Sequence, residues 1–262
     1  MEILLRPDAA VGSRTAAGVV ARLIREKPAC VLGLATGRTP MSLYHELIRM
    51  HREEGLDFSQ VTTFNLDEYV GLPPSHPHSY RYFMDTEFFQ HVNIVPEKTH
   101  LPDGCAVDLR SECRAYELRI RDAGGIDLQV LGLGSNGHIG FNEPTGSLGS
   151  RTWIKILSQR TRGDNSGMFE NPDDVPRHCI TMGIGTIMEA RHNLLLAFGP
   201  KKVRALAAMI EGPITAMCPA SALQFHRRVT VVADEAAAAG LDHLEHYHWI
   251  EANKLDWQQY PR

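Results

Sequence analysis

The sequence lacks a long apolar run, a strong net charge and an excess of basic residues. It has no stretch of about 18 apolar residues, which a membrane-spanning helix would need. The N-terminal segment reaches Arg6 before a long apolar core can form, so we expect no signal peptide and a cytoplasmic protein. Lys and Arg total 27 against 31 Asp and Glu. Nucleic-acid-binding domains are usually basic, so we expect a small-molecule ligand, with no nucleic acid or membrane as partner.

The sequence also lacks the motifs of disulfide-rich and zinc-binding proteins. Its five cysteines are odd in number and contain no C-x-x-C pair, which indicates neither a disulfide framework nor a zinc knuckle. His243, His246 and His248 lie close together near the C-terminus, but no H-E-x-x-H signature accompanies them. We expect a solvated or partner-facing helix there, and no metal site.

What the sequence does contain is a series of short apolar runs that alternate with helical patterns. Each run ends in Gly, Asn or Asp; the runs are residues 30–35, 61–66, 126–133, 194–198 and 229–233. Helical spacing follows at 15–26 and 201–211, and Pro40 suits the first position of another helix. Strands that alternate with helices predict an α/β fold: a single-domain, doubly wound, mostly parallel sheet over 1–262, Rossmann-like, with helices on both faces.

In such sheets ligands bind beyond the carboxyl ends of the strands, which directs attention to three loops. The first contains Thr36, Gly37, Arg38 and Thr39 between a predicted strand and helix. Glycine, two hydroxyls, a guanidinium and the unpaired N–H groups of a helix start would suit a phosphate. A capped turn without a ligand explains the same residues equally well.

The second loop places two adjacent carboxylates, Asp67 and Glu68, after the strand at 61–66. One of them could act as a general base, since only one need face a cleft. Alternatively, Asp67 caps the segment that follows, which is a common role for aspartate in such a place.

The third loop, residues 132–144, reads GLGSNGHIGFNEP. It contains a literal G-x-G-x-x-G, but the residues beyond it make a poor helix, and positions 150–160 hold no acid for a ribose. We therefore expect no dinucleotide site. The remaining feature is His138 with Glu143 five residues later. A glutamate that accepts one imidazole N–H would leave the other nitrogen to exchange protons, although a structural histidine satisfied by backbone groups fits as well.

Together these loops resemble the glucosamine-6-phosphate deaminase family. The strings that carry the resemblance are LGLATGRTP (32–40), VTTFNLDEYVGL (61–72), HPHSY (76–80), GLGSNGHIGFNEP (132–144) and SRT (150–152). The resemblance implies conversion of glucosamine 6-phosphate to fructose 6-phosphate and ammonia. It implies that Asp67 moves the C2 proton, and that His138 opens the sugar ring while Asn136 and Glu143 hold it. No hydride moves, so we expect no redox cofactor and no metal.

The resemblance also implies a phosphate site on Thr36, Gly37, Arg38 and Thr39, with Lys202 reaching in from a later loop. Relatives often carry an arginine in a mobile lid, where this chain has Gly167. We expect the lid at about 155–180, and we expect Arg38 to supply the missing charge.

A second departure concerns regulation. Allosteric relatives bind an acetylated amino-sugar phosphate through a basic, hydroxyl-bearing strand, where this chain has Gly146, Trp153 and Ile156 and keeps only Lys155. We expect weak or absent activation. Family members occur as monomers and as hexamers, so a homo-oligomer is one expected state. Other functions left open are a galactosamine-6-phosphate deaminase, a phosphosugar lactonase and a non-catalytic sugar-phosphate sensor.

Overall fold

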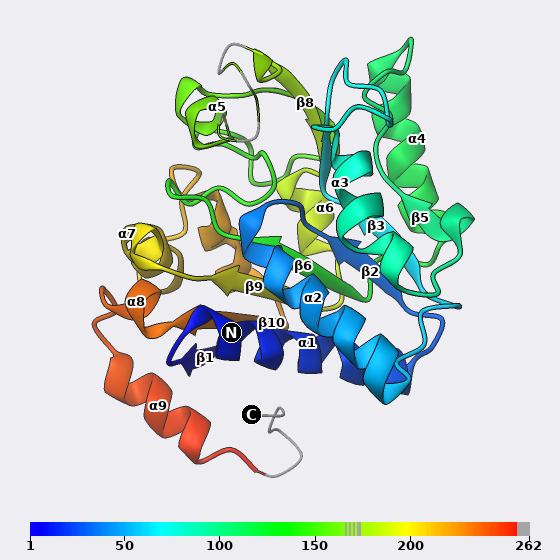
Figure 1. The fold of residues 1–262 in the computed structure, drawn as a ribbon. Coiled ribbons are helices and arrows are strands. Elements are labelled where there is room, and N and C mark those ends of the chain that lie inside the picture. Colours follow the sequence, from blue (N-terminus) through cyan, green and yellow to red (C-terminus); the bar gives the residue numbers. More distant parts are fainter. Residues whose placement is uncertain (166, 168, 170, 172–173, 256–262) are drawn as a thin grey trace.

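The computed structural model describes residues 1–165, 167, 169, 171 and 174–255. Its centre is a seven-stranded sheet in the order β1-β10-β9-β6-β2-β3-β5, in which every neighbouring pair is parallel (Figure 1). The strands of this sheet are β1 (Glu2–Arg6), β2 (Val31–Leu34), β3 (Thr62–Asn65), β5 (Thr99–His100), β6 (Leu128–Gly132), β9 (Asn193–Ala197) and β10 (Val229–Asp234). The predicted parallel sheet is confirmed, and each of the five apolar runs contains or overlaps one strand.

Helices cover both faces of the sheet. They are α1 (Ala9–Glu26), α2 (Arg38–Glu54), α3 (Tyr80–Glu87), α4 (Leu109–Asp122), α5 (Gln159–Asn165), α6 (Ile184–Met188), α7 (Val203–Ile210), α8 (Glu235–Ala238) and α9 (Leu244–Ala252). Neighbouring strand residues point to opposite faces: Leu194 packs in the cluster with α1, α2 and α3, whereas Leu195 packs in the cluster with α4, α6, α7 and α8. This alternation of buried residues makes the fold doubly wound.

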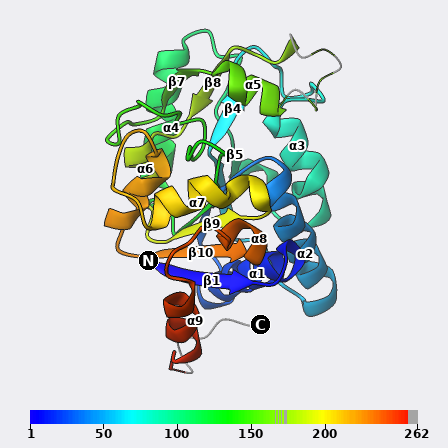
Figure 2. The same cartoon turned by 90° about the vertical axis from the view of Figure 1, so that its left-hand side faces the viewer.

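A second, three-stranded antiparallel sheet was not expected from the sequence. It consists of β4 (Asp67–Tyr69), β8 (His178–Thr181) and β7 (Trp153–Ile156), in the order β4-β8-β7, and lies beyond the large sheet at the top of Figure 2. Strand β4 has the sequence DEY and is buried throughout. Two adjacent carboxylates in a three-residue strand give no apolar run, so neither periodicity nor composition reveals it.

Two helix starts differ from the expected ones. Helix α1 begins at Ala9, six residues before the predicted start, because the side chain of Asp8 caps it by accepting from the amide of Val11 (2.7 Å). Pro40 is the third residue of α2 and not the first. The first-turn amides of a helix have no partner within the helix, so proline is tolerated there as well.

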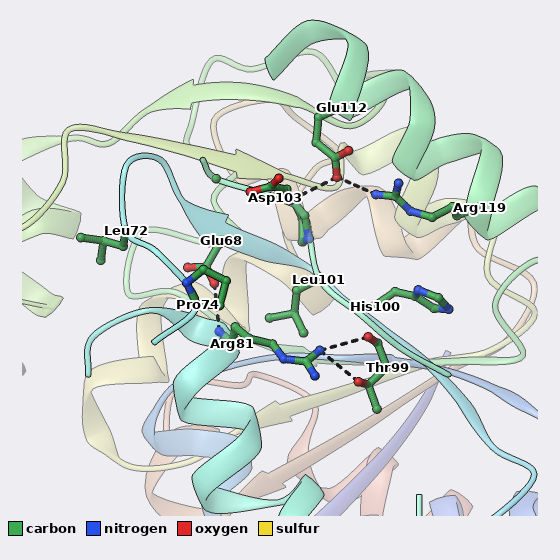
Figure 3. Close-up of a pocket in the computed structure, with 12 residues that line it drawn as sticks. Glu68, Leu72, Pro74, Arg81, Thr99, His100, Leu101, Asp103, Glu112 and Arg119 are labelled. Atoms are coloured by element: carbon green, nitrogen blue, oxygen red, sulfur yellow. Dashed lines mark hydrogen bonds and ion pairs between the residues drawn. The ribbon is translucent and has the colours of Figure 1, made fainter. Parts of the chain in front are cut away.

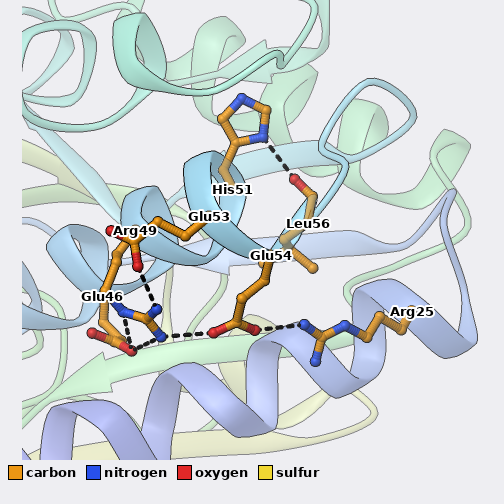
Figure 4. A network of polar contacts seen from close by, with 7 residues as sticks. All are labelled: Arg25, Glu46, Arg49, His51, Glu53, Glu54 and Leu56. Carbon is orange, nitrogen blue, oxygen red and sulfur yellow. Dashed lines mark hydrogen bonds and ion pairs between the residues drawn. The ribbon is translucent and has the colours of Figure 1, made fainter.

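Side-chain ion pairs join α2 to α1 far from the carboxyl edge of the sheet. Glu54 near the end of α2 accepts from Arg25 of α1 (3.0 Å) and from Arg49 (2.7 Å), as Figure 4 shows. These groups are substantially exposed, so they contribute little to stability. No described helix is both long and apolar enough to cross a membrane.

Candidate active site

The carboxyl edge of the large sheet gathers the residues singled out from the sequence. Thr36 follows β2, Asp67 follows β3 after one residue, His138 lies in the loop after β6, and Lys202 lies in the turn after β9. Strands β9, β6, β2 and β3 are consecutive neighbours and all parallel. Their carboxyl ends therefore lie side by side, as expected for a ligand site in an α/β sheet.

The loop after β6 is shaped by two glycines. A Cβ on Gly134 would lie 2.3–2.4 Å from three atoms of the His138 ring, so only glycine leaves space for the imidazole. Gly137 has φ +83°, and a Cβ there would meet Sγ of Cys218 at 2.6 Å. No helix forms over 133–149, in agreement with the expectation that the residues beyond the G-x-G-x-x-G string make a poor helix.

Asn136 stands between His138 and Glu143. Its Oδ1 lies 2.6 Å from Nδ1 of His138, and its Nδ2 donates to Oε2 of Glu143 (2.8 Å). The direct separation between His138 Nδ1 and Glu143 Oε2 is 3.9 Å, too long for a hydrogen bond. The sequence led us to expect direct contact between His138 and Glu143. The structure shows no direct hydrogen bond between them; instead Asn136, which was also expected to hold His138, lies between the two and relays the contact.

This relay determines the protonation of the imidazole. An ionised carboxylate only accepts, so Glu143 must face the NH₂ of Asn136, which turns Oδ1 toward His138. Oδ1 only accepts, so Nδ1 must carry a proton. In neutral His138 the nitrogen that can take up a proton is then Nε2. Hydrogen bonds, mainly from Thr161, overcome the effect of burial and hold the pKa of Glu143 below its usual value, which keeps it ionised.

Asp67 is a buried carboxylate with few polar neighbours. Its residue exposure is 5%, and no described residue donates a hydrogen bond to it within bonding distance. Burial, with a smaller contribution from the charge of Glu68, raises its pKa to about 8. A carboxylate in such surroundings binds a proton tightly and is a stronger base than an exposed aspartate.

Asp67 and Glu68 point to opposite sides of β4. Glu68 accepts from the backbone amides of Tyr69, Tyr80 and Arg81, and so binds the start of α3. It also lines a cavity of about 490 Å³ bordered by α3 and α4, which Asp67 does not line (Figure 3). The capping role considered for Asp67 is therefore filled by Glu68, together with Ser79, whose hydroxyl accepts from the amide of Tyr82.

The loop with His138 passes over Asp67. A Cβ on Gly140 would lie 2.9 Å from Oγ1 of Thr181 and 3.5 Å from Oδ2 of Asp67. Thr181 pairs with Asp67 across β4 and β8, and its hydroxyl accepts from the amide of Phe141 (3.1 Å). The loop that carries His138 is thus fixed against the strand that carries Asp67. Thr181 was not predicted as a site residue, because no pattern in the sequence indicates that strand β8 pairs with β4.

The loop at 36–39 forms the start of α2. Gly37 is the N-cap with φ +106° and has no side chain to cap this helix, in contrast to the N-cap residues of α1 and α3. The N-terminal amides of α2 therefore remain for another acceptor. Arg38 is exposed, and a Cβ on Gly167 would lie 3.4 Å from its guanidinium. Arg38 thus reaches the place where a side chain at position 167 would start.

The described residues contain no group of three or more His, Cys, Asp or Glu side chains placed to hold a metal ion. The rings of His76 and His78 lie 5.4 Å apart, and His78 packs against Phe169. His243 is the N-cap residue of α9, and its side chain makes no capping hydrogen bond.

Comparisons with known proteins agree with this arrangement. The family model described as glucosamine-6-phosphate isomerases/6-phosphogluconolactonase matches residues 9–232. The chain belongs to this family. Proteins named glucosamine-6-phosphate deaminase from Arthrobacter sp. (strain FB24) and Hahella chejuensis are each 51% identical to it, over 98% and 97% of this chain and 99% and 97% of theirs.

Solved structures show the same fold. One described as a monomeric glucosamine-6-phosphate deaminase matches with a TM-score of 0.90 and 45% identity, over 92% of this chain and all of that one. A 6-phosphogluconolactonase from Trypanosoma cruzi matches with a TM-score of 0.72 over 92% of this chain and 97% of its own, but at 21% identity. The second likeness concerns the fold alone.

Proposed function

We propose that this chain is an enzyme that converts glucosamine 6-phosphate to fructose 6-phosphate and ammonia. The observation that carries the proposal is the arrangement at the sheet edge. A donor-poor, buried Asp67 lies under the loop that presents His138 in a fixed tautomer. The proposal is also supported by two proteins named glucosamine-6-phosphate deaminase, each 51% identical to this chain over nearly its full length. The chemistry takes place in the cytoplasm under this proposal, since charged sugar phosphates do not cross membranes freely.

The reaction needs two proton-transfer groups. Neutral His138, with its proton on Nδ1, would take the proton of the C1 hydroxyl at Nε2 and give it to the ring oxygen as the C1–O5 bond breaks and the aldehyde forms. Ionised Asp67 would then remove the proton from C2, the electron pair would form the C1–C2 double bond of the enol, and O1 would gain a proton as the C2 ammonium loses one. Return of the proton to C1 leaves an imine at C2. Water adds to that imine, and ammonia departs as the C2 carbonyl forms.

The functional test is direct. Purified protein mixed with glucosamine 6-phosphate should release ammonia and fructose 6-phosphate in equal amounts. Galactosamine 6-phosphate, which differs in configuration at C4, is the matched control for specificity. Hydrolysis of 6-phosphogluconolactone without ammonia release would favour a lactonase, and binding of glucosamine 6-phosphate without turnover would favour a sensor. Either result would overturn the proposal.

The start of α2 is the proposed phosphate site, formed by Thr36, Gly37, Arg38 and Thr39, with Lys202 from the turn after β9. The uncapped helix start supports it. The position of Arg38 beside Gly167 supports the idea that Arg38 replaces a lid arginine. The lid itself, at about 155–180, stays a prediction, and residues 166, 168, 170 and 172–173 within it lie outside the described part of the chain.

Replacing Arg38 by alanine is expected to raise KM for glucosamine 6-phosphate about tenfold and change kcat less than threefold. The reason is that a phosphate contact is made equally in the ground state and the transition state. Steady-state kinetics measure both constants, and Arg38→Lys should lose less. An equal fall in kcat would instead give Arg38 a part in the chemistry.

Activation by N-acetylglucosamine 6-phosphate is expected to be weak or absent. Lys155, the basic residue that this strand keeps, has its Nζ 4.7 Å from the ring centre of Trp153, and Ile156 is exposed with no hydroxyl to offer. Rates measured across substrate concentrations, with and without this compound, should follow the same hyperbolic curve. Sigmoidal kinetics that the compound abolishes would contradict the expectation.

The oligomeric state is a separate question. Light scattering would distinguish the monomer from a homo-oligomer.

A further inference from the structure

Two hydroxyl groups at the start of α5 contact the carboxylate of Glu143. Thr161 donates from Oγ1 to Oε1 of Glu143 in a short hydrogen bond, and Ser158 donates to the same oxygen (2.9 Å). The other oxygen, Oε2, accepts a hydrogen bond from Nδ2 of Asn136. Both oxygens of Glu143 are therefore used, one toward α5 and one toward His138.

Thr161 joins α5 to this site. It is 2% exposed, whereas its neighbours Gln159 and Arg160 are exposed. Its amide also donates to Oγ of Ser158 (3.1 Å), so the same pair shapes the first turn of the helix. Thr161 thus combines deep burial with a hydrogen bond to Glu143.

We propose that Thr161, supported by Ser158, is a positioning residue that sets the Glu143–Asn136–His138 relay, so that His138 holds the correct tautomer only when α5 is docked. This rests on the proposed function. Thr161 lies at the far end of the chain of hydrogen bonds and acts through Glu143, Asn136 and His138 in turn.

The physical basis is the orientation of an acceptor. Without the Thr161 hydroxyl, Glu143 loses its largest pKa-lowering contact, and its affinity for a proton rises. A protonated or rotated Glu143 no longer selects the NH₂ of Asn136. The amide can then turn its NH₂ toward Nδ1 of His138, which favours the proton on Nε2 and removes the base needed there.

The first test separates the effect of the Thr161 hydroxyl on kcat from the effect of Thr161 packing in α5. Thr161→Val keeps the shape and removes the hydroxyl, and it should lower kcat about tenfold with KM changed less than twofold. Thr161→Ser keeps the hydroxyl and should retain most of kcat. Arg160→Ala changes an exposed residue of the same helix and should leave both constants unchanged. Equal loss in Thr161→Val and Thr161→Ser would assign the effect to packing and overturn the proposal.

The second test asks whether Thr161 acts through Glu143. In a Glu143→Gln background, Thr161→Val should reduce kcat by less than twofold further, since the carboxylate that it orients is already gone. A full additional tenfold loss would show that Thr161 acts by another route.

The third test does not depend on turnover. Nitrogen NMR of ¹⁵N-histidine-labelled protein, with His138→Gln to identify the signals, reports the tautomer of His138. Wild type and Thr161→Ser should show the proton on Nδ1, and Thr161→Val should show a substantial fraction on Nε2. An unchanged tautomer in Thr161→Val would overturn the inference. Absence of ammonia release from wild type would instead contradict the proposed function, and the NMR result would still decide the role of Thr161.

Discussion

Asp67→Asn is expected to lower kcat for ammonia release from glucosamine 6-phosphate by about 10²- to 10⁴-fold, the usual contribution of one well-placed general base. The amide has nearly the same shape and cannot accept the C2 proton. Coupled assays for ammonia and fructose 6-phosphate measure the loss. Asp108→Asn, in an exposed N-cap on α4, is the matched control and should keep the wild-type rate. A variant at position 67 with more than a tenth of wild-type activity would contradict this role.

Asp67→Asn is also expected to stabilise the folded protein relative to wild type, and this advantage should grow as the pH rises. Because the pKa of Asp67 is raised to about 8 in the folded protein, the folded state holds a proton that the unfolded state has lost. Folding stability contributed by this group therefore falls between its unfolded pKa, about 4, and about 8. Asparagine has no such dependence. The advantage of Asp67→Asn should grow by at most about 1.4 kcal/mol per pH unit across that window.

Urea unfolding of both proteins at pH 5 and pH 7.5 measures this advantage, since all other titrating groups are common to the two. A difference in unfolding free energy that does not change with pH would show that Asp67 has an ordinary pKa. The ionised, active form of Asp67 also gains population toward pH 8, so the strength of the base comes at the cost of stability.

His138→Ala is the second substitution with a large expected effect, a fall in kcat of about 10²- to 10⁴-fold through loss of the ring-opening proton transfer. Gly134 leaves a space shaped for an imidazole, so added imidazole should restore part of the rate in a saturable manner. His246→Ala, on the exposed side of α9, should have no effect. If imidazole fails to raise the rate of His138→Ala while the protein stays folded, proton transfer by this ring is not what the substitution removed.

The sequence predicts the large sheet well because its strands are buried on both faces and read as apolar runs. It also predicts that Asp67 and His138 each follow a strand of this sheet; the order, in which β2 lies between β3 and β6, comes from the structure. Strands β1 and β5 lie at the edges of the sheet, and β4 is only three residues long, so none of them has a distinctive pattern.

The contacts within the site were harder to predict. Asp67 and Glu68 are adjacent in the chain, and only the pairing of β4 with β8 determines which of them faces the loop at 137–143. The asparagine amide between His138 and Glu143 depends on distances that spacing along the chain does not give. Thr161 lies 18 residues after Glu143 and becomes relevant only through the folded position of α5.

The central claim is that one buried carboxylate, Asp67, carries a proton from C2 to C1. Single-turnover reaction of glucosamine 6-phosphate deuterated at C2, followed by mass and NMR analysis of fructose 6-phosphate, tests it most directly. Because Asp67 is only 5% exposed, exchange of its proton with water should be slow, and part of the deuterium should appear at C1. Product without deuterium at C1 would contradict transfer by this residue.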